Sequence, residues 1–257
     1  MKQLVLILFL GHVMMSCYTN TKDSVVIETN GVSKDTVISL EKDTLNITNA
    51  LVLGRFDYKN DSSFVKVNAE HTQKTIYLNR EVYQAFLQML EAAKQDDIVF
   101  KLISGTRNFK EQKAIWERKW TRYKHLNPED RALKILEYSS MPGTSRHHWG
   151  TDIDLNSLNN SYFNSGKGLK EYQWLISHAN RFGFYQVYTD KVNGRTGYHP
   201  EKWHWSYLPL ASQYLAFYNA HISEKDINGF KGSELAAQLR IIENYINGIS
   251  KKAINYN

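Results

Sequence analysis

The chain has 257 residues, of which 42% are hydrophobic and 13% aromatic, and it carries a formal net charge of +6. Basic proteins can attract anionic polymers, but lysine and arginine form no run interleaved with aromatic residues, so we expect no nucleic-acid partner. The one cysteine excludes an intrachain disulfide, and the apolar content is enough for one sizeable core.

The N-terminal segment has the composition of an export signal. Lys2 provides positive charge, residues 4–10 are apolar, and Ser16 directly precedes Cys17. This apolar stretch is too short to span a membrane, so we expect residues 1–16 to be a signal peptide. A small residue before the lone cysteine favours a lipoprotein signal, which would leave Cys17 lipidated at a membrane. The alternative is an ordinary secretory signal with an incidental cysteine.

The rest of the chain divides by composition. Residues 17–49 are rich in Ser, Thr, Asn, Asp and Lys, which predicts a polar tether. Residues 50–257 predict a single catalytic domain that ends in helices. We therefore expect an exported, monomeric protein that is held in the cell envelope.

Hydrophobic periodicity and capping residues predict a mixture of helices and strands. The expected strands are 64–67, 98–103, 151–155, 184–188 and 203–207. The expected helices follow Asn79, Asn108 and Asn127, occupy 169–182, and follow Pro209 and Ser233. Asn193-Gly194 indicates a hairpin turn. Because the helices and strands do not alternate regularly, the pattern predicts an α+β fold.

One short run near the middle of the chain carries groups that can bind a cation. It contains His147 and His148, followed by Asp152 and Asp154 in the strand predicted at 151–155. Alternate residues of a strand share a face, so the two carboxylates point the same way and repel each other unless a cation or a donor lies between them. Asp152 could instead pair with the nearby arginine of this run, and one of the adjacent histidines is expected to be structural.

A second run adds another histidine and a glutamate. His204 lies between Trp203 and Trp205, so in a strand it faces away from both tryptophans. Glu201 must lie in the turn after Pro200 if it is to face the same way as His204. Two histidines, one aspartate and a spare glutamate form the ligand set of a catalytic zinc site, although His204 alone is also typical of a hydrogen-bonded core residue.

These runs resemble a known family. Its motifs are Ser-x-His-x-x-Gly-x-x-x-Asp and, downstream, Glu-x-x-His, here Ser145, His147, Gly150, Asp154, Glu201 and His204. Upstream, the segment with Ser104, Gly105, Arg107 and Gln112 looks like the family's Ser-Gly-Tyr-Arg-Ser-x-x-x-Gln motif. The pattern resembles the zinc D-alanyl-D-alanine carboxypeptidases of the VanY type, which belong to a group of peptidoglycan peptidases that also contains L,D-carboxypeptidases and endopeptidases. The resemblance implies a hedgehog/DD-peptidase-like domain, with a central antiparallel sheet flanked by helices.

The resemblance also implies a role for each motif residue. It implies one zinc ion bound by His147, Asp154 and His204, Glu201 as general base, Arg107 at the oxyanion or the substrate carboxylate, and Ser145 and Gln112 at the peptide. His148 would not be a ligand. The chain departs from the family pattern at Asp152, where alanine is common, and at Thr106 and Asn108, which replace tyrosine and serine. These departures bear on the substrate subsite rather than on the metal.

The function implied is a zinc metallopeptidase that trims peptidoglycan stem peptides, most simply as a D,D- or L,D-carboxypeptidase. One alternative is an endopeptidase of the same family. Another is a zinc-stabilised module that binds the cell wall without catalysis, against which Glu201 counts because a structural site needs no base. A nuclease is the least favoured, because the aromatic residues fall at core positions rather than on a stacking platform.

Overall fold

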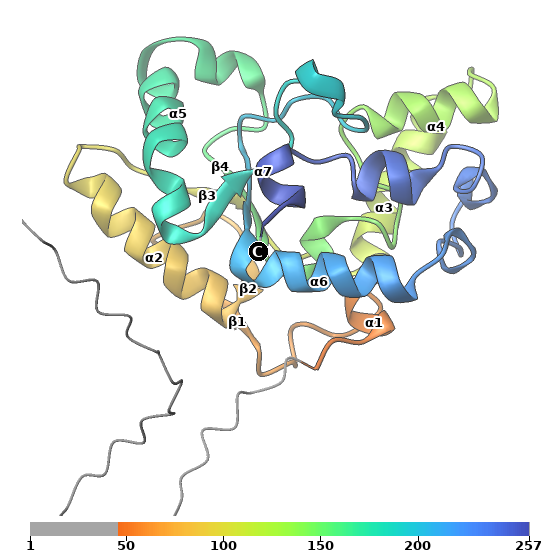
Figure 1. Cartoon of the computed structure of the whole chain (residues 1–257), viewed down its shortest axis with the longest axis horizontal. Coiled ribbons are helices and arrows are strands. Elements are labelled where there is room, and N and C mark those ends of the chain that lie inside the picture. The colour runs from red at the N-terminus through yellow and green to blue at the C-terminus, as the bar shows by residue number, and fades with distance from the viewer. Residues whose placement is uncertain (1–45, 257) are drawn as a thin grey trace, which may run out of the picture. The chain divides into compact units, whose positions relative to one another are not determined.

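The computed structural model describes residues 46–256, and Figure 1 shows it as a mixture of helices and short strands. Four of the strands form the central antiparallel sheet. The order across the sheet is β3-β4-β6-β5, and the strands are β3 (Leu102–Ser104), β4 (Asp152–Leu155), β6 (His204–Tyr207) and β5 (Phe184–Gln186). A separate antiparallel pair consists of β1 (Phe64–Lys66) and β2 (Tyr77–Asn79). The fold is therefore α+β, as the sequence predicts.

The register of the two middle strands positions the polar residues. Asp154 lies opposite His204, and Asp152 lies opposite Ser206. Ile153 and Leu155 on the other face of β4 are fully buried in the hydrophobic core. The alternation predicted for residues 151–155 is confirmed, and it brings two carboxylates and one imidazole onto the same face of the sheet.

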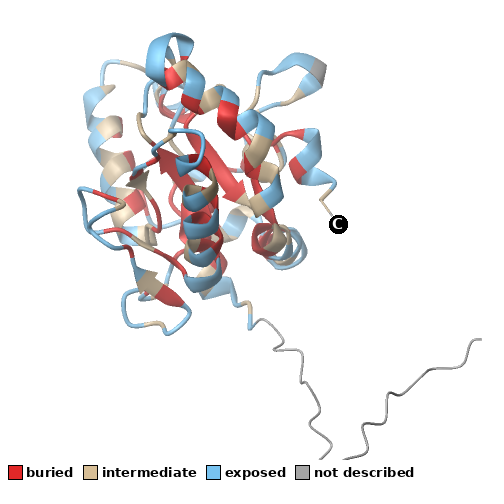
Figure 2. Cartoon of the chain, turned by 90° about the vertical axis from the view of Figure 1, so that its left-hand side faces the viewer, coloured by how far each residue is buried: buried red, intermediate tan, exposed pale blue. Residues whose placement is uncertain are grey.

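Helices flank the sheet. They are α1 (Asn49–Val52), α2 (Arg80–Lys94), α3 (Phe109–Arg122), α4 (Pro128–Leu136), α5 (Gly166–His178), α6 (Leu208–His221) and α7 (Lys251–Ile254). Shorter turns are η1 (Arg146–Trp149), η2 (Asn160–Asn164), η3 (Ala179–Phe182), η4 (Val192–Gly194), η5 (Glu224–Asp226), η6 (Ser233–Leu235) and η7 (Ile242–Ile246), the last a π turn. In Figure 2 the strands are buried, whereas the helices expose their outer faces to solvent.

A capping box fixes the first turn of α3, directly after Arg107. The side chain of Asn108 accepts a hydrogen bond from the backbone of Glu111, and the Glu111 carboxylate accepts one from the backbone of Asn108. This capping box is the predicted one. The helix buries Trp116 and Trp120. Because β3 ends only a few residues earlier, Arg107 is held between a sheet strand and a capped helix.

Three local predictions are wrong. The strand expected at 98–103 is restricted to β3, and Asn193-Gly194 lies in the short helical turn η4 rather than in a hairpin. β5 and β6 do pair, but a long loop joins them. The helix expected after Ser233 is broken into short turns, since Arg240 has a positive φ of 50° that a continuous helix does not allow.

The expected signal peptide and most of the expected tether lie outside the described residues. Residues 46–256 belong to one compact unit. Its packing includes Ile47, which contacts the hydrophobic core. Within this part of the chain, no helix combines the length and the apolar character needed to cross a membrane.

Candidate active site

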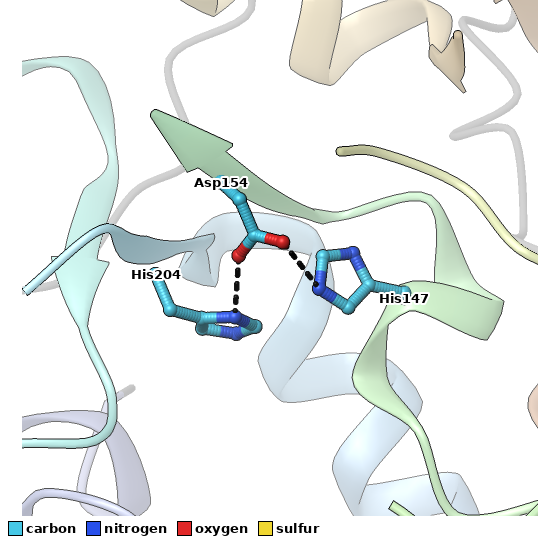
Figure 3. A group of neighbouring side chains, drawn as sticks. All are labelled: His147, Asp154 and His204. Atoms are coloured by element: carbon cyan, nitrogen blue, oxygen red, sulfur yellow. Dashed lines mark hydrogen bonds and ion pairs between the residues drawn. The ribbon is translucent and has the colours of Figure 1, made fainter. Parts of the chain in front are cut away.

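Three side chains that the sequence singles out come together above the central sheet (Figure 3). His147 belongs to η1, Asp154 to β4 and His204 to β6, and one donor atom from each lies within 4.8 Å of the others. Asp154 Oδ1 is 3.0 Å from His204 Nδ1, and Asp154 Oδ2 is 3.4 Å from His147 Nε2. All three residues are buried. The group can hold one metal ion.

The other nitrogen of each imidazole is already engaged. His147 Nδ1 lies 2.9 Å from the carbonyl oxygen of Gly105, and His204 Nε2 lies 2.8 Å from Asp152 Oδ2. Each of these nitrogens therefore carries a proton and donates it. His147 Nε2 and His204 Nδ1 are left facing Asp154, which is the usual arrangement of a metal ligand oriented by a second hydrogen bond.

The charges around the group favour a cation. Burial lowers the pKa of His204, but hydrogen bonds to Asp152 and Asp154 outweigh burial and raise that pKa to about 10. Burial also raises the pKa of Asp154, yet His147 and His204 hold it below its usual range. Two buried carboxylates thus stabilise positive charge at this point, which is the property that a metal site requires.

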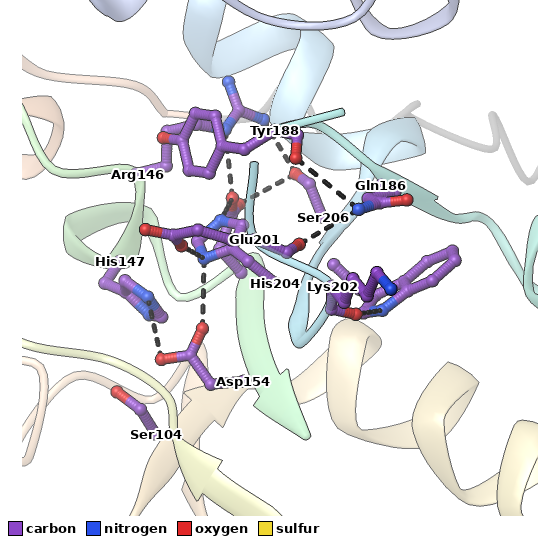
Figure 4. A network of polar contacts seen from close by, with 12 residues as sticks. Ser104, Arg146, His147, Asp154, Gln186, Tyr188, Glu201, Lys202, His204 and Ser206 are labelled. Atoms are coloured by element: carbon purple, nitrogen blue, oxygen red, sulfur yellow. Dashed lines mark hydrogen bonds and ion pairs between the residues drawn. The ribbon is translucent and has the colours of Figure 1, made fainter. Parts of the chain in front are cut away.

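Asp152 forms the centre of a second buried network. Figure 4 labels three of its partners, Arg146, His204 and Ser206. Its Oδ2 accepts hydrogen bonds from Arg146 Nε at 3.0 Å and from His204 Nε2 at 2.8 Å. Its Oδ1 accepts from Ser206 Oγ at 2.8 Å and from Thr151 Oγ1 at 2.7 Å. Asp152 has no exposed surface and Arg146 only 2%. The pairing with Arg146 is therefore present, and the same carboxylate also orients His204.

His148 points away from the group formed by His147, Asp154 and His204. Its Nδ1 donates to the carbonyl oxygen of Arg107 at 2.7 Å, and its Nε2 accepts from the backbone N–H of Gly143 at 3.1 Å. Gly54 packs against the ring, where a Cβ atom would lie 2.3 Å from His148 Nδ1. Both nitrogens are thus committed to the backbone, and His148 joins the Arg107 segment to the turn before η1.

Glu201 lies in the turn just before β6. Its Oε2 is 3.7 Å from His204 Nδ1, and its backbone N–H donates to the carbonyl oxygen of Tyr188 at 2.9 Å. Gln186 Nε2 donates to the Glu201 carbonyl oxygen at 3.1 Å. Burial raises the pKa of Glu201 to about 8, against the opposing effect of His204. The turn thus holds this carboxylate beside His204.

A cavity of about 600 Å³ opens onto this group. Arg107, Gln112 and Ser145 all line it. Arg107 Nη1 donates to Ser104 Oγ at 2.9 Å, and Gln112 Nε2 donates to the carbonyl oxygen of Ser140 at 2.8 Å. Among residues 46–256, Arg107 Nε, Gln112 Oε1 and Ser145 Oγ are buried without a hydrogen-bond partner. Buried polar atoms normally form hydrogen bonds, so these three atoms are available to a molecule bound in the cavity.

Several lining residues were not anticipated from the sequence. Tyr188 lies with its ring centre 4.7 Å from that of His204, and Lys119 lies further along α3. Helical spacing places Ile115 and Lys119 on the same face of α3 as Gln112. Once Gln112 is assigned to the site, the sequence therefore predicts that the other two lie near it. No local signal marks Tyr188, because only the fold brings the loop after β5 to this position.

Comparison with known proteins places the chain in a family. Residues 75–210 match the model of the family VanY, D-alanyl-D-alanine carboxypeptidase. The chain is 27% identical over 146 residues to YodJ of Bacillus subtilis (strain 168), which is named for carboxypeptidase activity. This alignment covers 56% of the chain and 51% of YodJ. The chain is also 26% identical over 142 residues to the D-alanyl-D-alanine carboxypeptidase of Enterococcus faecalis (strain ATCC 700802 / V583), covering 54% and 52%.

Two solved structures are also similar. The vancomycin resistance D,D-pentapeptidase VanY of a VanB-type cassette, solved as a mutant with Zn(II), has a TM-score of 0.48 at 22% identity and covers 67% of this chain and 93% of its own. The LD-carboxypeptidase LdcB has a TM-score of 0.46 at 20% identity, covering 75% and 81%. The chain spans about half the length of the curated relatives it matches. Because the family model covers more than half of its residues, the chain belongs to the VanY D-alanyl-D-alanine carboxypeptidase family.

Proposed function

We propose that the protein is a zinc metallopeptidase that removes the C-terminal D-alanine from peptidoglycan stem peptides. The observation that carries this proposal is the position of Glu201, 3.7 Å from His204 within a buried group of two imidazoles and one carboxylate. A purely structural zinc site needs four protein ligands and no base, whereas a catalytic site keeps a position for water. Membership of the VanY family supports the same activity.

His147, Asp154 and His204 are the proposed ligands of one zinc ion. Neutral imidazole and carboxylate oxygen are ordinary zinc ligands, and burial lowers the pKa of His147, which favours its neutral form. Bound zinc supplies a Lewis acid and lowers the pKa of a coordinated water from about 15.7 to about 7. Asp152 is proposed to hold His204 through Nε2, so that Nδ1 stays directed at the ion.

Glu201 is proposed to move the proton. Its carboxylate takes a proton from the attacking water and delivers it to the nitrogen of the leaving D-alanine, so the peptide C–N bond breaks without releasing an unprotonated amine. Burial raises the pKa of Glu201 above that of an exposed glutamate, which makes its carboxylate a stronger base. The hydrogen bonds to the Glu201 backbone from β5 and its following loop keep the turn in place.

Arg107, Ser145 and Gln112 are proposed to bind the peptide. Arg107 presents a planar guanidinium that is anchored by Ser104, and its fork matches either a terminal carboxylate or the developing oxyanion. Ser145 Oγ and Gln112 Oε1 are the buried atoms that a peptide backbone would satisfy. A cationic lining suits a substrate that ends in a free carboxylate, which favours carboxypeptidase activity over cleavage within a crosslink.

The envelope location is proposed from the N-terminal sequence. Residues 1–16 are proposed to direct export, 17–49 to act as a tether, and Cys17 to carry the lipid. The Cys17→Ser variant should leave the membrane fraction yet still hydrolyse stem peptides. If it stays bound to membranes after a salt wash, lipidation of this residue is wrong.

Defined stem peptides test the activity. The zinc-loaded protein is incubated with a tetrapeptide, a pentapeptide and a crosslinked dimer, and the products are identified by mass spectrometry. Free D-alanine supports the proposal, and the substrate that yields it distinguishes L,D- from D,D-specificity. A split crosslink or a released dipeptide would make the protein an endopeptidase. Binding to all three substrates without any cleavage would leave a wall-binding module.

A further inference from the structure

The cavity has a second cationic region that the proposed mechanism does not use. Lys119 and Arg118, both on α3, line it together with Ile115, Tyr138 and Leu158. Lys119 is half-buried and donates a hydrogen bond to Ser139 Oγ. Within residues 46–256, neither Lys119 nor Arg118 forms an ion pair with a carboxylate. Two cations that form no ion pair within the described residues therefore line this cavity.

Helix geometry separates Lys119 from Gln112, which is proposed to bind the peptide. Gln112 and Lys119 are seven residues apart and lie on nearly the same face of α3, which corresponds to about 10 Å along the helix axis. An extended peptide spans about 3.5 Å per residue, so this distance corresponds to about three residues, or to fewer when a long side chain is included. A group bound at Lys119 thus belongs to a different part of the peptide from the one that Gln112 contacts.

The residues that line this part of the cavity indicate which chemical group Lys119 could bind. Ile115, Tyr138 and Leu158 provide apolar surface in the same cavity that the two cations line. Partial burial, and then the charge of Arg122, lower the pKa of Lys119, so its charged form is less stable than in water. A bound carboxylate would stabilise the charged form again. The region therefore matches a long aliphatic side chain that ends in a carboxylate.

We propose that Lys119, assisted by Arg118, binds a second carboxylate of the substrate, on the side chain of the diamino acid at the third position of the stem peptide. This inference rests on the proposed function and names its substrate class. Stem peptides carry either lysine or diaminopimelic acid at this position. The lysine side chain ends in an ammonium alone, which these cations repel, whereas diaminopimelic acid adds a carboxylate on the same carbon. The protein is thus selective for peptides with the free acid.

A matched pair of tetrapeptides tests the selectivity, one with the diaminopimelate side-chain carboxyl free and one with it amidated. The two differ in charge but hardly in shape. Wild-type kcat/KM should be about tenfold higher for the free acid, the range expected of a partly exposed charge-assisted hydrogen bond. Lys119→Met should lose this preference by lowering the value for the free acid alone, and Arg118→Gln should reduce it less, because Arg118 is exposed.

Lys110→Met is the control. Lys110 is an exposed lysine of the same helix, nine residues and therefore two and a half turns from Lys119, on the opposite face. This variant should behave as wild type. If Lys119→Met lowers kcat/KM equally for both peptides, the lysine binds the terminal carboxylate or supports the fold, and the proposal is wrong. Equal use of the two peptides by the wild type would also overturn it.

Binding separates this inference from the proposed function. The peptides are titrated by calorimetry into the zinc-loaded Glu201→Gln protein and into the same protein carrying Lys119→Met. A tenfold preference for the free acid that disappears with Lys119 supports the subsite even if the wild type hydrolyses neither peptide. Absence of hydrolysis refutes the peptidase proposal, whereas absence of a binding preference refutes the subsite.

Discussion

Replacing Asp152 is expected to affect two properties that can be measured separately. In the Asp152→Ala variant the guanidinium of Arg146 loses the carboxylate that lies 3.0 Å away, and both groups are buried. Removing one partner of a buried ion pair costs about 3–5 kcal/mol, so the free energy of unfolding of the metal-free protein should fall by this amount. His204 Nε2 also loses its acceptor at 2.8 Å. Losing such a support typically weakens metal binding about 10–100-fold.

A second variant distinguishes the two effects. Arg146→Met combined with Asp152→Ala removes both charges and leaves no buried ion without a partner, so most of the lost unfolding free energy should return. Metal affinity should remain low, because His204 Nε2 still lacks its acceptor. Urea unfolding of the metal-free proteins and zinc competition with a chelating dye provide the two measurements. If zinc affinity recovers together with stability in the double variant, Asp152 acts through the fold and not through His204, and the reasoning is refuted.

The remaining predictions concern the other site residues. Glu201→Gln should retain zinc and thermal stability while turnover of stem peptides falls about 10²–10⁴-fold, and turnover equal to wild type would exclude Glu201 as the base. His147→Ala should lose stoichiometric zinc in elemental analysis. His148→Ala should keep one zinc but lose about 3 kcal/mol of unfolding free energy, because the Arg107 carbonyl and a backbone N–H lose their buried partner. If His148→Ala loses zinc and His147→Ala keeps it, the ligand is assigned to the wrong histidine. Arg107→Lys should lower kcat/KM with unchanged zinc content, and full activity would exclude a role for its planar fork.

The strands that carry the proposed ligands could be predicted because their signals are local. Alternation in residues 151–155 puts Asp152 and Asp154 on one face, and the expected donor between them exists. The sequence did not identify that donor as His204. Strand register between segments fifty residues apart depends on packing across the whole sheet, and no local pattern specifies it.

The failed prediction at Asn193-Gly194 has a tertiary cause. An Asn-Gly pair favours a tight hairpin when the flanking strands pair directly. Here the loop between β5 and β6 is held open by Arg195, whose guanidinium donates to the carbonyl oxygens of Thr189, Tyr198 and Gly248. These hydrogen bonds join distant parts of the chain, so they compete with the local turn preference and cannot be read from its sequence.

The pairing of Asp154 with His204 has a consequence for how specificity can change. Both residues lie on adjacent hydrogen-bonded strands, while the intervening segment carries cavity residues such as Leu158, Tyr188 and Tyr198. Insertions, deletions and substitutions in this segment would alter the cavity wall, yet the ladder between β4 and β6 keeps the spacing of these two proposed ligands. The fold thus separates the positions that shape the cavity from the strand pairing that sets the proposed metal site.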